Sequence, residues 1–256
     1  MIYIKTKEEI KKLREGGRRL AIILDKVAQK VVAGTNTKEL DNYAEELIRQ
    51  GGDIPAFLGY KSRKDHRPYP ASLCVSVNNE VVHSLPDQNQ ILKEGDIVSL
   101  DLGLKHKGLY TDTAITVSVG EIDKQAKKLL EITRKALMIG IDSAKVGNSV
   151  GDIGYNIEKF VKPFGFGIIK VLAGHGVGKK VHEDPLIPNF GKKGTGEKLK
   201  LGMVIALEPM LNEGSDEVYI GEDGFTFKTK DGKRSAHFEH TILITESEAE
   251  ILTKKW

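Results

Sequence analysis

The sequence has few features that would mark a secreted, membrane-bound or nucleic-acid-binding protein. Its single cysteine, Cys74, excludes an intramolecular disulfide and fits a reducing compartment. Its longest apolar runs, such as LAIIL at 20–24, are much shorter than the roughly 18 residues of a membrane-spanning helix. Neither sign of charge is in large excess, because 39 basic and 36 acidic residues leave a net charge of only +3. We therefore expect a cytoplasmic protein that recognises neither membranes nor nucleic acid directly.

The composition itself is typical of a globular domain. Hydrophobic residues make up 39% and charged residues 29% of the 256 positions. The sequence has no low-complexity segment or Pro- and Ser-rich linker that would divide it. A chain of this length can bury a substantial core. We expect a single domain over residues 1–256.

The predicted secondary structure has the same order twice, two helices and then a set of strands. Thr6 and Glu9 form a capping box in front of the first helix. The first half has helices at about 6–32 and 37–52 and strand-like segments at 71–78, 96–104 and 111–120. The second half has helices at 123–145 and 149–165 and strand-like segments at 165–178, 200–211 and 237–245. The order predicts two related halves, at roughly 1–120 and 121–256.

Short sequence matches between the halves support this duplication. The segment LKEGDIVSLDLG, which contains Asp101, aligns without gaps with LKLGMVIALEPM, which contains Glu208. TDTAITV aligns with FEHTILI and places Asp112 opposite Glu239. VVHSLPD and KVHEDPL align at a histidine in each. Because several matches occur in the same order, they indicate a duplicated α+β unit, and two copies are too few for a solenoid.

The duplication pairs carboxylate with carboxylate. If the strands of Asp101 and Asp112 form a hairpin, both side chains can point into one space, with Glu208 and Glu239 facing them from the other half. Four converging carboxylates resist ionising together, and divalent cations would resolve that conflict. His175, in the glycine-rich AGHGVG, could complete the ligand set. Taken singly, each of these residues also fits a strand end, a turn or a surface position.

The chemistry of this donor set indicates which ions it would hold. Oxygen ligands dominate and thiolates are missing, so the set suits manganese, iron or cobalt at least as well as zinc. Two metals close together can turn a bridging water into a nucleophile near neutral pH. A buried carboxylate without a partner is costly, and its appearance at matching positions in two apolar strands favours a shared cation.

Five segments resemble, in the same order, the metal and catalytic segments of type I methionine aminopeptidases. They are GDIVSLDLG, TDTA, AGHGVGKKVHEDP, ALEPM and AHFEHTILIT. The resemblance covers nearly the whole chain. It implies the pita-bread fold, an α+β fold with two pseudo-symmetric halves around a central antiparallel sheet, and one catalytic domain. It also implies a cytoplasmic and commonly monomeric enzyme that removes the initiator methionine from nascent polypeptides near the ribosome, with preference for a small second residue.

The resemblance also implies roles for individual residues. Two divalent ions, with cobalt, manganese and iron as first candidates and zinc and nickel as further ones, would be held by Asp101, Asp112, His175, Glu208 and Glu239. Asp112 and Glu239 would bridge the two ions. Glu208 would also take the proton of the attacking water. His182 would stabilise the tetrahedral intermediate, and His83 would lie near the α-amino end of the substrate and assist proton transfer.

The methionine pocket is implied by AFLGY, PYPASLC and EDGFTFKTKDG. The residues that these similarities place in it are Phe57, Tyr60, Tyr69, Cys74, Val181 and Phe225. Each is also apolar enough to be ordinary core. The chain departs from the family pattern in an insertion at 61–68, KSRKDHRP, which could alter access to the pocket, contact an acidic partner or be a solvated loop. Phe225 and Val181 also differ from the residues that many members carry, which puts the shape of the pocket in doubt.

Two other classes of pita-bread protein compete with this interpretation. Prolidases and Xaa-Pro aminopeptidases are similar at the metal ligands, yet they usually carry an additional N-terminal domain. Metal-free binding proteins keep the fold but have lost ligands, whereas all five ligand positions are filled here. Both remain alternatives at the level of the sequence.

Overall fold

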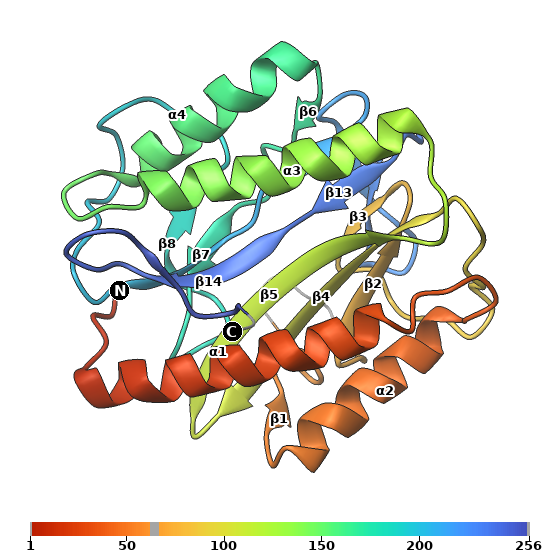
Figure 1. Ribbon diagram of the computed structural model, residues 1–256, viewed down its shortest axis with the longest axis horizontal. Helices are drawn as coiled ribbons and strands as arrows, with labels where there is room; N and C mark the ends of the chain where they lie inside the picture. The colour runs from red at the N-terminus through yellow and green to blue at the C-terminus, as the bar shows by residue number, and fades with distance from the viewer. Residues whose placement is uncertain (1, 62–66, 255–256) are drawn as a thin grey trace.

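The computed structural model describes residues 2–61 and 67–254. Four helices and a long central sheet make up most of the described chain. The helices are α1 (Lys7–Ala28), α2 (Thr37–Gln50), α3 (Lys124–Ser143) and α4 (Val150–Val161), the last followed by a 3-10 turn, η1 (Lys162–Phe164). Figure 1 shows α1 and α3 running across the near side of the sheet, each beside its partner helix.

The central sheet has nine strands within the described residues, in the order β1-β4-β5-β14-β9-β7-β8, with β2 paired to β4 and β15 to β14. Its strands are β1 (Ile54–Pro55), β2 (Leu73–Val77), β4 (Ile97–His106), β5 (Leu109–Ser118), β7 (Gly174–Gly176), β8 (Glu183–Ile187), β9 (Val204–Leu207), β14 (Glu239–Leu243) and β15 (Glu250–Ile251). Two small sheets accompany it. They are formed by β6 (Gly167–Ile168), β10 (Met210–Asn212) and β13 (Ser235–His237), and by β3 (Glu80–Val82), β11 (Val218–Ile220) and β12 (Phe227–Thr229).

All four predicted helices are present, and the first ends earlier than expected. The capping box is confirmed, because Thr6 accepts the backbone N–H of Glu9 while the Glu9 carboxylate accepts that of Thr6. The helix predicted to reach residue 32 stops at Ala28, where the N–H of Val31 bonds to the carbonyl of Ala28 three residues earlier. That tighter turn brings Val31 into the core.

Each helix pair covers the core of its own half. In the first half, Leu100 and Leu102 of β4 lie in one buried cluster with Leu20 of α1 and Ile48 of α2. Side chains alternate along a strand, so Asp101 between those leucines points to the other face of the sheet.

The second half is built in the same way. Ile205 and Leu207 of β9 share a buried cluster with Leu129 of α3 and Ile153 of α4. These apolar side chains therefore face the helices of their own half, and the opposite face of the sheet carries polar side chains such as Asp101 together with a smaller apolar cluster that includes Val204 and Ala206.

The halves join at β5 and β14, which pair antiparallel. Side-chain bonds reinforce the junction: the Thr113 hydroxyl donates to the carbonyl of Glu239 at 2.7 Å, and the Thr241 hydroxyl donates to the carbonyl of Asp112 at 2.7 Å. The sheet is thus continuous from one half to the other, as expected for two α+β halves around a central antiparallel sheet.

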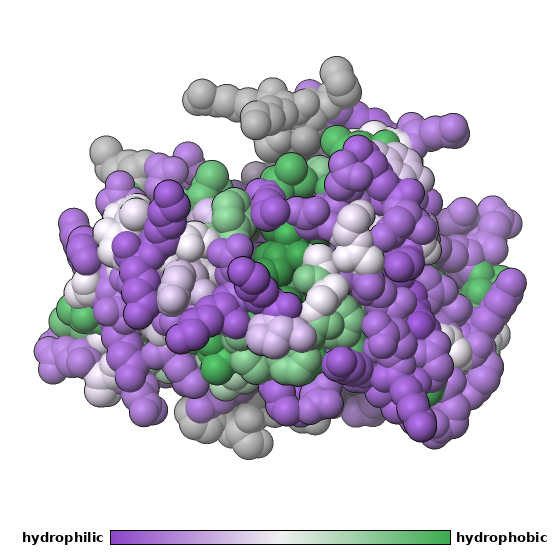
Figure 2. All heavy atoms as spheres, turned by 90° about the horizontal axis from the view of Figure 1, so that it is seen from above, coloured by the Kyte–Doolittle hydropathy of each residue, from purple (hydrophilic) through white to green (hydrophobic). Residues whose placement is uncertain are grey.

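The face seen in Figure 2 is mainly hydrophilic, with small hydrophobic areas between the polar side chains. Over residues 2–61 and 67–254, none of the helices combines the length and the apolar character that crossing a bilayer requires.

Candidate metal centre

Strand register brings the predicted ligands of the first half to one face of the sheet. Asp101 of β4 and Glu239 of β14 are both paired with the same residue, Ala114 of β5. Residues paired across an antiparallel sheet point to the same face. Asp112 lies two residues before Ala114 in β5, so its side chain shares that face as well.

The register on the other side of β14 adds the remaining two ligands. His175 of β7 is paired with Ala206 of β9, and Ala206 is paired with Thr241, two residues after Glu239. Glu208 follows Ala206 by two residues, directly after β9 ends. All five predicted ligands therefore project from the face of the sheet opposite the helices.

The donor atoms are close together. One donor atom from each of Asp112, His175 and Glu239 lies within 4.8 Å of the other two. The Nε2 of His175 is 3.5 Å from a carboxylate oxygen of Glu208, and the carboxyl groups of Asp101 and Asp112 are close enough to shift each other's pKa. The structure thus brings together every residue that was predicted to bind metal.

Burial controls the protonation of these groups when no ion is bound. It raises the pKa of Asp101 to about 7, and it raises the pKa of Asp112 well above the ordinary value, with the neighbouring Asp101 charge adding to the effect. The pKa of Glu208 and that of Glu239 are also well above the ordinary value, mainly because of burial and then because of the adjacent carboxylates. Burial lowers the pKa of His175 to about 4, which keeps the imidazole neutral and able to bind a metal near pH 7.

The residues fit a divalent cation. Within the described part of the chain, Asp101 Oδ1, Asp112 Oδ1 and Glu239 Oε1 are buried and have no hydrogen-bond partner. A buried carboxylate oxygen without a partner carries a desolvation cost, and a cation would offset it. The donor set, four carboxylates and one neutral imidazole, is the oxygen-rich kind that manganese, iron and cobalt accept.

His182 lies directly beside this cluster, in the segment between β7 and β8. Its Nδ1 is 2.6 Å from the hydroxyl of Tyr60, and its ring stands edge-on to that of His175 with 4.4 Å between centroids. Surrounding protein atoms, and then the rings of His175 and His83, keep the pKa of His182 well below the ordinary value, although the residue as a whole remains exposed. A neutral, reachable imidazole can donate a hydrogen bond to a bound peptide.

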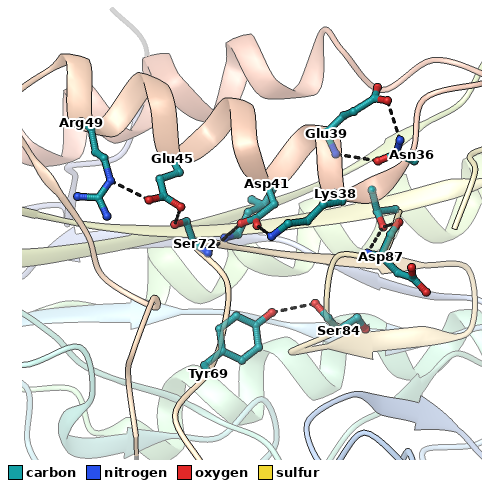
Figure 3. Close-up of polar contacts among 12 residues, drawn as sticks. Asn36, Lys38, Glu39, Asp41, Glu45, Arg49, Tyr69, Ser72, Ser84 and Asp87 are labelled. Carbon is teal, nitrogen blue, oxygen red and sulfur yellow. Dashed lines mark hydrogen bonds and ion pairs between the residues drawn. The ribbon is translucent and has the colours of Figure 1, made fainter. Parts of the chain in front are cut away.

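His83 follows β3 in an uncommon backbone conformation. Its φ is +59°, in the left-handed region, and its ring stands edge-on to Phe227 at 5.8 Å. The carbonyl of the next residue, Ser84, accepts the Tyr69 hydroxyl at 2.8 Å and the N–H of Val75 at 3.3 Å. Figure 3 shows Tyr69 directed toward Ser84. These two bonds fix the chain immediately after His83.

A cavity of about 180 Å³ opens onto the metal cluster. It is lined by Phe57, Tyr60, Tyr69, Cys74, His83, Asp101, Asp112, His175, His182, Glu208, Phe225 and Glu239. Val181 packs in the same apolar cluster as Phe57 and Tyr69. Gly103 packs directly against the Phe57 ring, and a Cβ at this position would lie only 2.8 Å from that ring.

The single cysteine lines this cavity as an apolar group. Burial raises the pKa of the Cys74 thiol well above its ordinary value, so the thiol stays protonated near neutral pH. A protonated thiol is a poor nucleophile, so Cys74 serves here as part of the apolar wall.

A second, more open cavity of about 360 Å³ meets the first at the cluster of histidines and carboxylates. Both are lined by His83, His175, His182 and Glu208. The second cavity is also bordered by Tyr3 from the N-terminal segment. These four residues therefore lie between a small apolar cavity and a larger open one.

The insertion at 61–68 begins and ends beside the apolar cavity. Tyr69 and Tyr60 are joined by a backbone hydrogen bond of 2.8 Å. Arg67 stacks over the Phe225 ring at 4.8 Å and donates to the carbonyl of Asp223 at 3.0 Å. Residues 62–66 lie outside the described residues, so the proposed contacts of the basic insertion stay a prediction.

The sequence analysis missed His237, at the end of β13. Its Nε2 is 3.7 Å from a carboxylate oxygen of Glu208, and burial lowers its pKa to about 3. The alternation in HFEH, which places His237 two residues before Glu239, was the available signal.

Comparisons with known proteins agree with this geometry. Residues 11–246 match the model of metallopeptidase family M24. A methionine aminopeptidase of Clostridium perfringens is 45% identical over 99% of both chains. The crystal structure of methionine aminopeptidase from Thermotoga maritima superimposes with a TM-score of 0.95 at 46% identity, covering all of both chains.

The fold is shared more widely than the sequence. Prolidase from Pyrococcus furiosus has a TM-score of 0.78 at only 23% identity, and the match covers 99% of this chain and 66% of that one. That likeness shows the pita-bread fold alone, so the prolidase alternative is not favoured. A metal-free binding protein is likewise not favoured, because a ligand-type residue stands at each of the five positions and the chain matches a metallopeptidase family. The chain belongs to metallopeptidase family M24, a family of metal-dependent hydrolases, and within it to the methionine aminopeptidases.

Proposed function

We propose that this chain removes the N-terminal methionine from nascent polypeptides whose second residue is small. The observation that carries the proposal is the position of the metal cluster between two unequal cavities. The smaller cavity, of about 180 Å³, has room for one side chain, whereas the larger one, of about 360 Å³, is open enough for a continuing chain. Such an arrangement favours cleavage after the first residue of a peptide.

The small cavity suits methionine by its lining. Phe57, Tyr69, Cys74 and Phe225 present aromatic rings and a protonated thiol to its interior. A flexible thioether gains from contact with aromatic edges and from burial of its methylene groups. We assign these residues, together with Tyr60, to recognition of the methionine side chain.

The reaction would take place at the ligand cluster. Two divalent ions, when bound by Asp101, Asp112, His175, Glu208 and Glu239, would supply an activated water and polarise the peptide carbonyl. Asp112 and Glu239 come from opposite sides of the junction between the halves and have donor atoms within 4.8 Å of each other, and they would be the bridging ligands. The oxygen-rich set favours manganese, iron or cobalt as the working ion, with zinc and nickel as further candidates.

Three side chains would then move or hold protons. Glu208 borders both cavities and would accept the proton of the attacking water. His182 would donate a hydrogen bond to the oxygen of the tetrahedral intermediate. His83, which precedes the hydrogen-bonded carbonyl of Ser84, would lie near the α-amino end of the substrate and assist transfer of the proton from Glu208 to the leaving amine.

The setting follows from this substrate class. Nascent chains are available near the ribosome in the cytoplasm, and we propose that the protein works there as a monomer. We treat residues 1–256 as one catalytic unit, because β5 and β14 from the two halves form a single sheet.

Release of free methionine from Met-Ala-Ser by the metal-stripped protein, titrated with manganese, iron or cobalt, tests the proposal. Ala-Pro and a peptide that begins Met-Pro are assayed alongside. Metal-dependent cleavage of Met-Ala-Ser that spares Ala-Pro is expected. Cleavage of Ala-Pro in its place, or no cleavage with any of these ions, would contradict it.

A further inference from the structure

A buried ion pair ties the N-terminal segment to the catalytic face. The Nζ of Lys5 lies 2.6 Å from a carboxylate oxygen of Glu183, and each side chain is only 1% exposed. Neither residue belongs to the metal cluster. Figure 1 shows the N-terminal segment beside β7 and β8 before it enters α1. Because desolvation offsets most of the attraction within a buried ion pair, such a pair contributes little net stability relative to apolar packing.

Glu183 closes the turn that carries His182. One of its carboxylate oxygens accepts the backbone N–H groups of both Lys179 and Lys180, the second at 2.9 Å. Its other oxygen accepts Lys5. Glu183 directly follows His182, so a single carboxylate connects the start of the turn, its end and the N-terminal segment.

Lys5 is itself fixed on both sides. Its backbone N–H bonds to the carbonyl of Gly202 at 3.0 Å, and its neighbour Ile4 bridges to Met203 beside β9. Gly178, with φ +140°, lies directly against the lysine stem, because a Cβ there would be 2.5 Å from the Lys5 Cε. The lysine therefore rests on the turn as well as pairing with its carboxylate.

The other histidine of this region does not depend on the pair. His175 is held in β7 by pairing with Ala206 of β9. His182 lies outside the strands, and its ring contacts Tyr60 and His175 without fixing the backbone that carries it. The backbone of His182 is therefore held from two sides, by the start of β8, where Glu183 pairs with Gly176, and by the turn that the Glu183 carboxylate closes.

We propose that Lys5 and Glu183 are positioning residues for His182. The ion pair holds the turn in the position in which the His182 ring faces a peptide bound between the two cavities. The inference rests on the proposed role of His182 in the reaction. Lys5, 178 positions away in the chain from Glu183, then belongs to the active site although it touches no reacting atom.

Steady-state kinetics of Lys5→Met, at a temperature well below its melting point, test the proposal. We expect kcat for Met-Ala-Ser to fall by about 10- to 100-fold, since misplacement of a catalytic group by about 1 Å has effects of this size. KM should stay within about threefold, because the apolar cavity is not touched. Lys5→Arg should recover part of kcat. Lys127→Met breaks the exposed pair between Lys127 of α3 and Glu121 before that helix, and as the matched control it should leave both constants unchanged.

A double-mutant cycle with His182→Ala separates positioning from general stability. If Lys5 acts through His182, adding Lys5→Met to His182→Ala will lower kcat no further. Independent, multiplicative losses, or a normal kcat in Lys5→Met with only a lower melting point, would overturn the proposal.

Two further checks keep the result interpretable. If Lys5→Met does not fold, Lys5→Met/Glu183→Gln removes both charges and keeps an acceptor for the turn. This variant should show the same loss of kcat, and a normal kcat would overturn the proposal. Failure of the wild-type chain to cleave Met-Ala-Ser would count against the proposed function itself, which separates the two claims.

Discussion

Tyr69 connects the apolar cavity to the backbone of His83. Its ring lines the cavity and stands edge-on to Phe225 at 5.4 Å, while its hydroxyl donates to the carbonyl of Ser84. His83, one residue earlier, has the left-handed φ of +59°. The hydroxyl therefore helps to hold a conformation that few residues other than glycine adopt.

Tyr69→Phe should separate these two functions of the side chain. The ring stays, so KM for Met-Ala-Ser should change by less than about twofold, whereas loss of a hydrogen bond worth about 1 kcal/mol should lower kcat by about three- to tenfold. Tyr43→Phe on α2 is the control. An unchanged kcat together with a raised KM would show that Tyr69 acts only as pocket wall.

Single residues differed in how far the sequence could identify them. The convergence of the five predicted ligand residues could be anticipated because carboxylates recur at matching positions in two apolar strands, as Asp101 and Glu208 do. The pairing of Lys5 with Glu183 could not, because neither residue lies in a periodic pattern and 178 positions separate them. His237 was missed because burial, which no local pattern reveals, is what distinguishes it from a surface histidine.

Among the secondary-structure elements, α2 and β2 are joined by a buried carboxylate. Asp41 of α2 is 1% exposed and accepts the backbone N–H groups of Ser72 and Leu73 at 2.8 and 3.0 Å. Lys38, one turn earlier, donates to its other oxygen at 2.6 Å (Figure 3). This contact places the start of β2, the strand that carries Cys74 into the apolar cavity.

Asp41→Ala should destabilise the fold through those two backbone groups. Each buried N–H left without an acceptor costs about 1–3 kcal/mol, so we expect a loss of about 2–4 kcal/mol in the free energy of unfolding, measured by urea titration. Lys38→Met removes only the 42% exposed partner and should cost less than about 1 kcal/mol. Equal losses of unfolding free energy in the two variants would show that Asp41 stabilises the fold through its ion pair with Lys38 and not through the backbone of β2.

The link between α3 and the segment before β13 should respond to pH. Hydrogen bonds from Arg234, and then from the N–H of Ala126, lower the pKa of Asp123 to about 2 from its ordinary 3.8. A carboxylate whose pKa is lowered on folding stabilises the native state above its unfolded pKa and loses that effect as the pH falls through the folded one.

Asp123→Asn keeps the helix cap and removes the charge. The wild-type advantage in the free energy of unfolding should be constant above about pH 4 and shrink between about pH 4 and pH 2. Urea titrations of both proteins across this range measure it. An advantage that is independent of pH over that interval would contradict the assignment to the Asp123 charge.

The helices were easier to predict than the short strands. Capping residues and apolar spacing predicted a helix at 37–52, and α2 extends over Thr37–Gln50. The segment 165–178 was expected to form strand with turns, and it contains only β6 and β7, of two and three residues. Their limits depend on pairing with distant partners such as β10 and β9, which local propensity does not encode.

Across the whole molecule, the two halves meet where the proposed bridging ligands lie. Asp112 belongs to β5 of the first half and Glu239 to β14 of the second, and hydrogen bonds from Thr113 and Thr241 cross the same junction. The duplication visible in the sequence predicted this symmetry. A metal bound here should therefore stabilise both halves at once.

Calorimetry with and without metal tests that coupling. We expect one transition in both states, and an ion at about 100 times its Kd should add about 2.7 kcal/mol, which raises Tm by about 5–10 °C for a chain of this size. Two transitions, of which only one moves on addition of metal, would mean that the halves unfold separately.

Anomalous diffraction from crystals of the cobalt-loaded protein is the most direct test of the central claim, that five side chains from both halves form one dinuclear centre. The account predicts two anomalous peaks, both within coordination distance of Asp112 and Glu239, with Asp101, His175 and Glu208 completing the ligands. Peaks elsewhere, or a loaded protein in which Asp112 and Glu239 contact no metal, would contradict it.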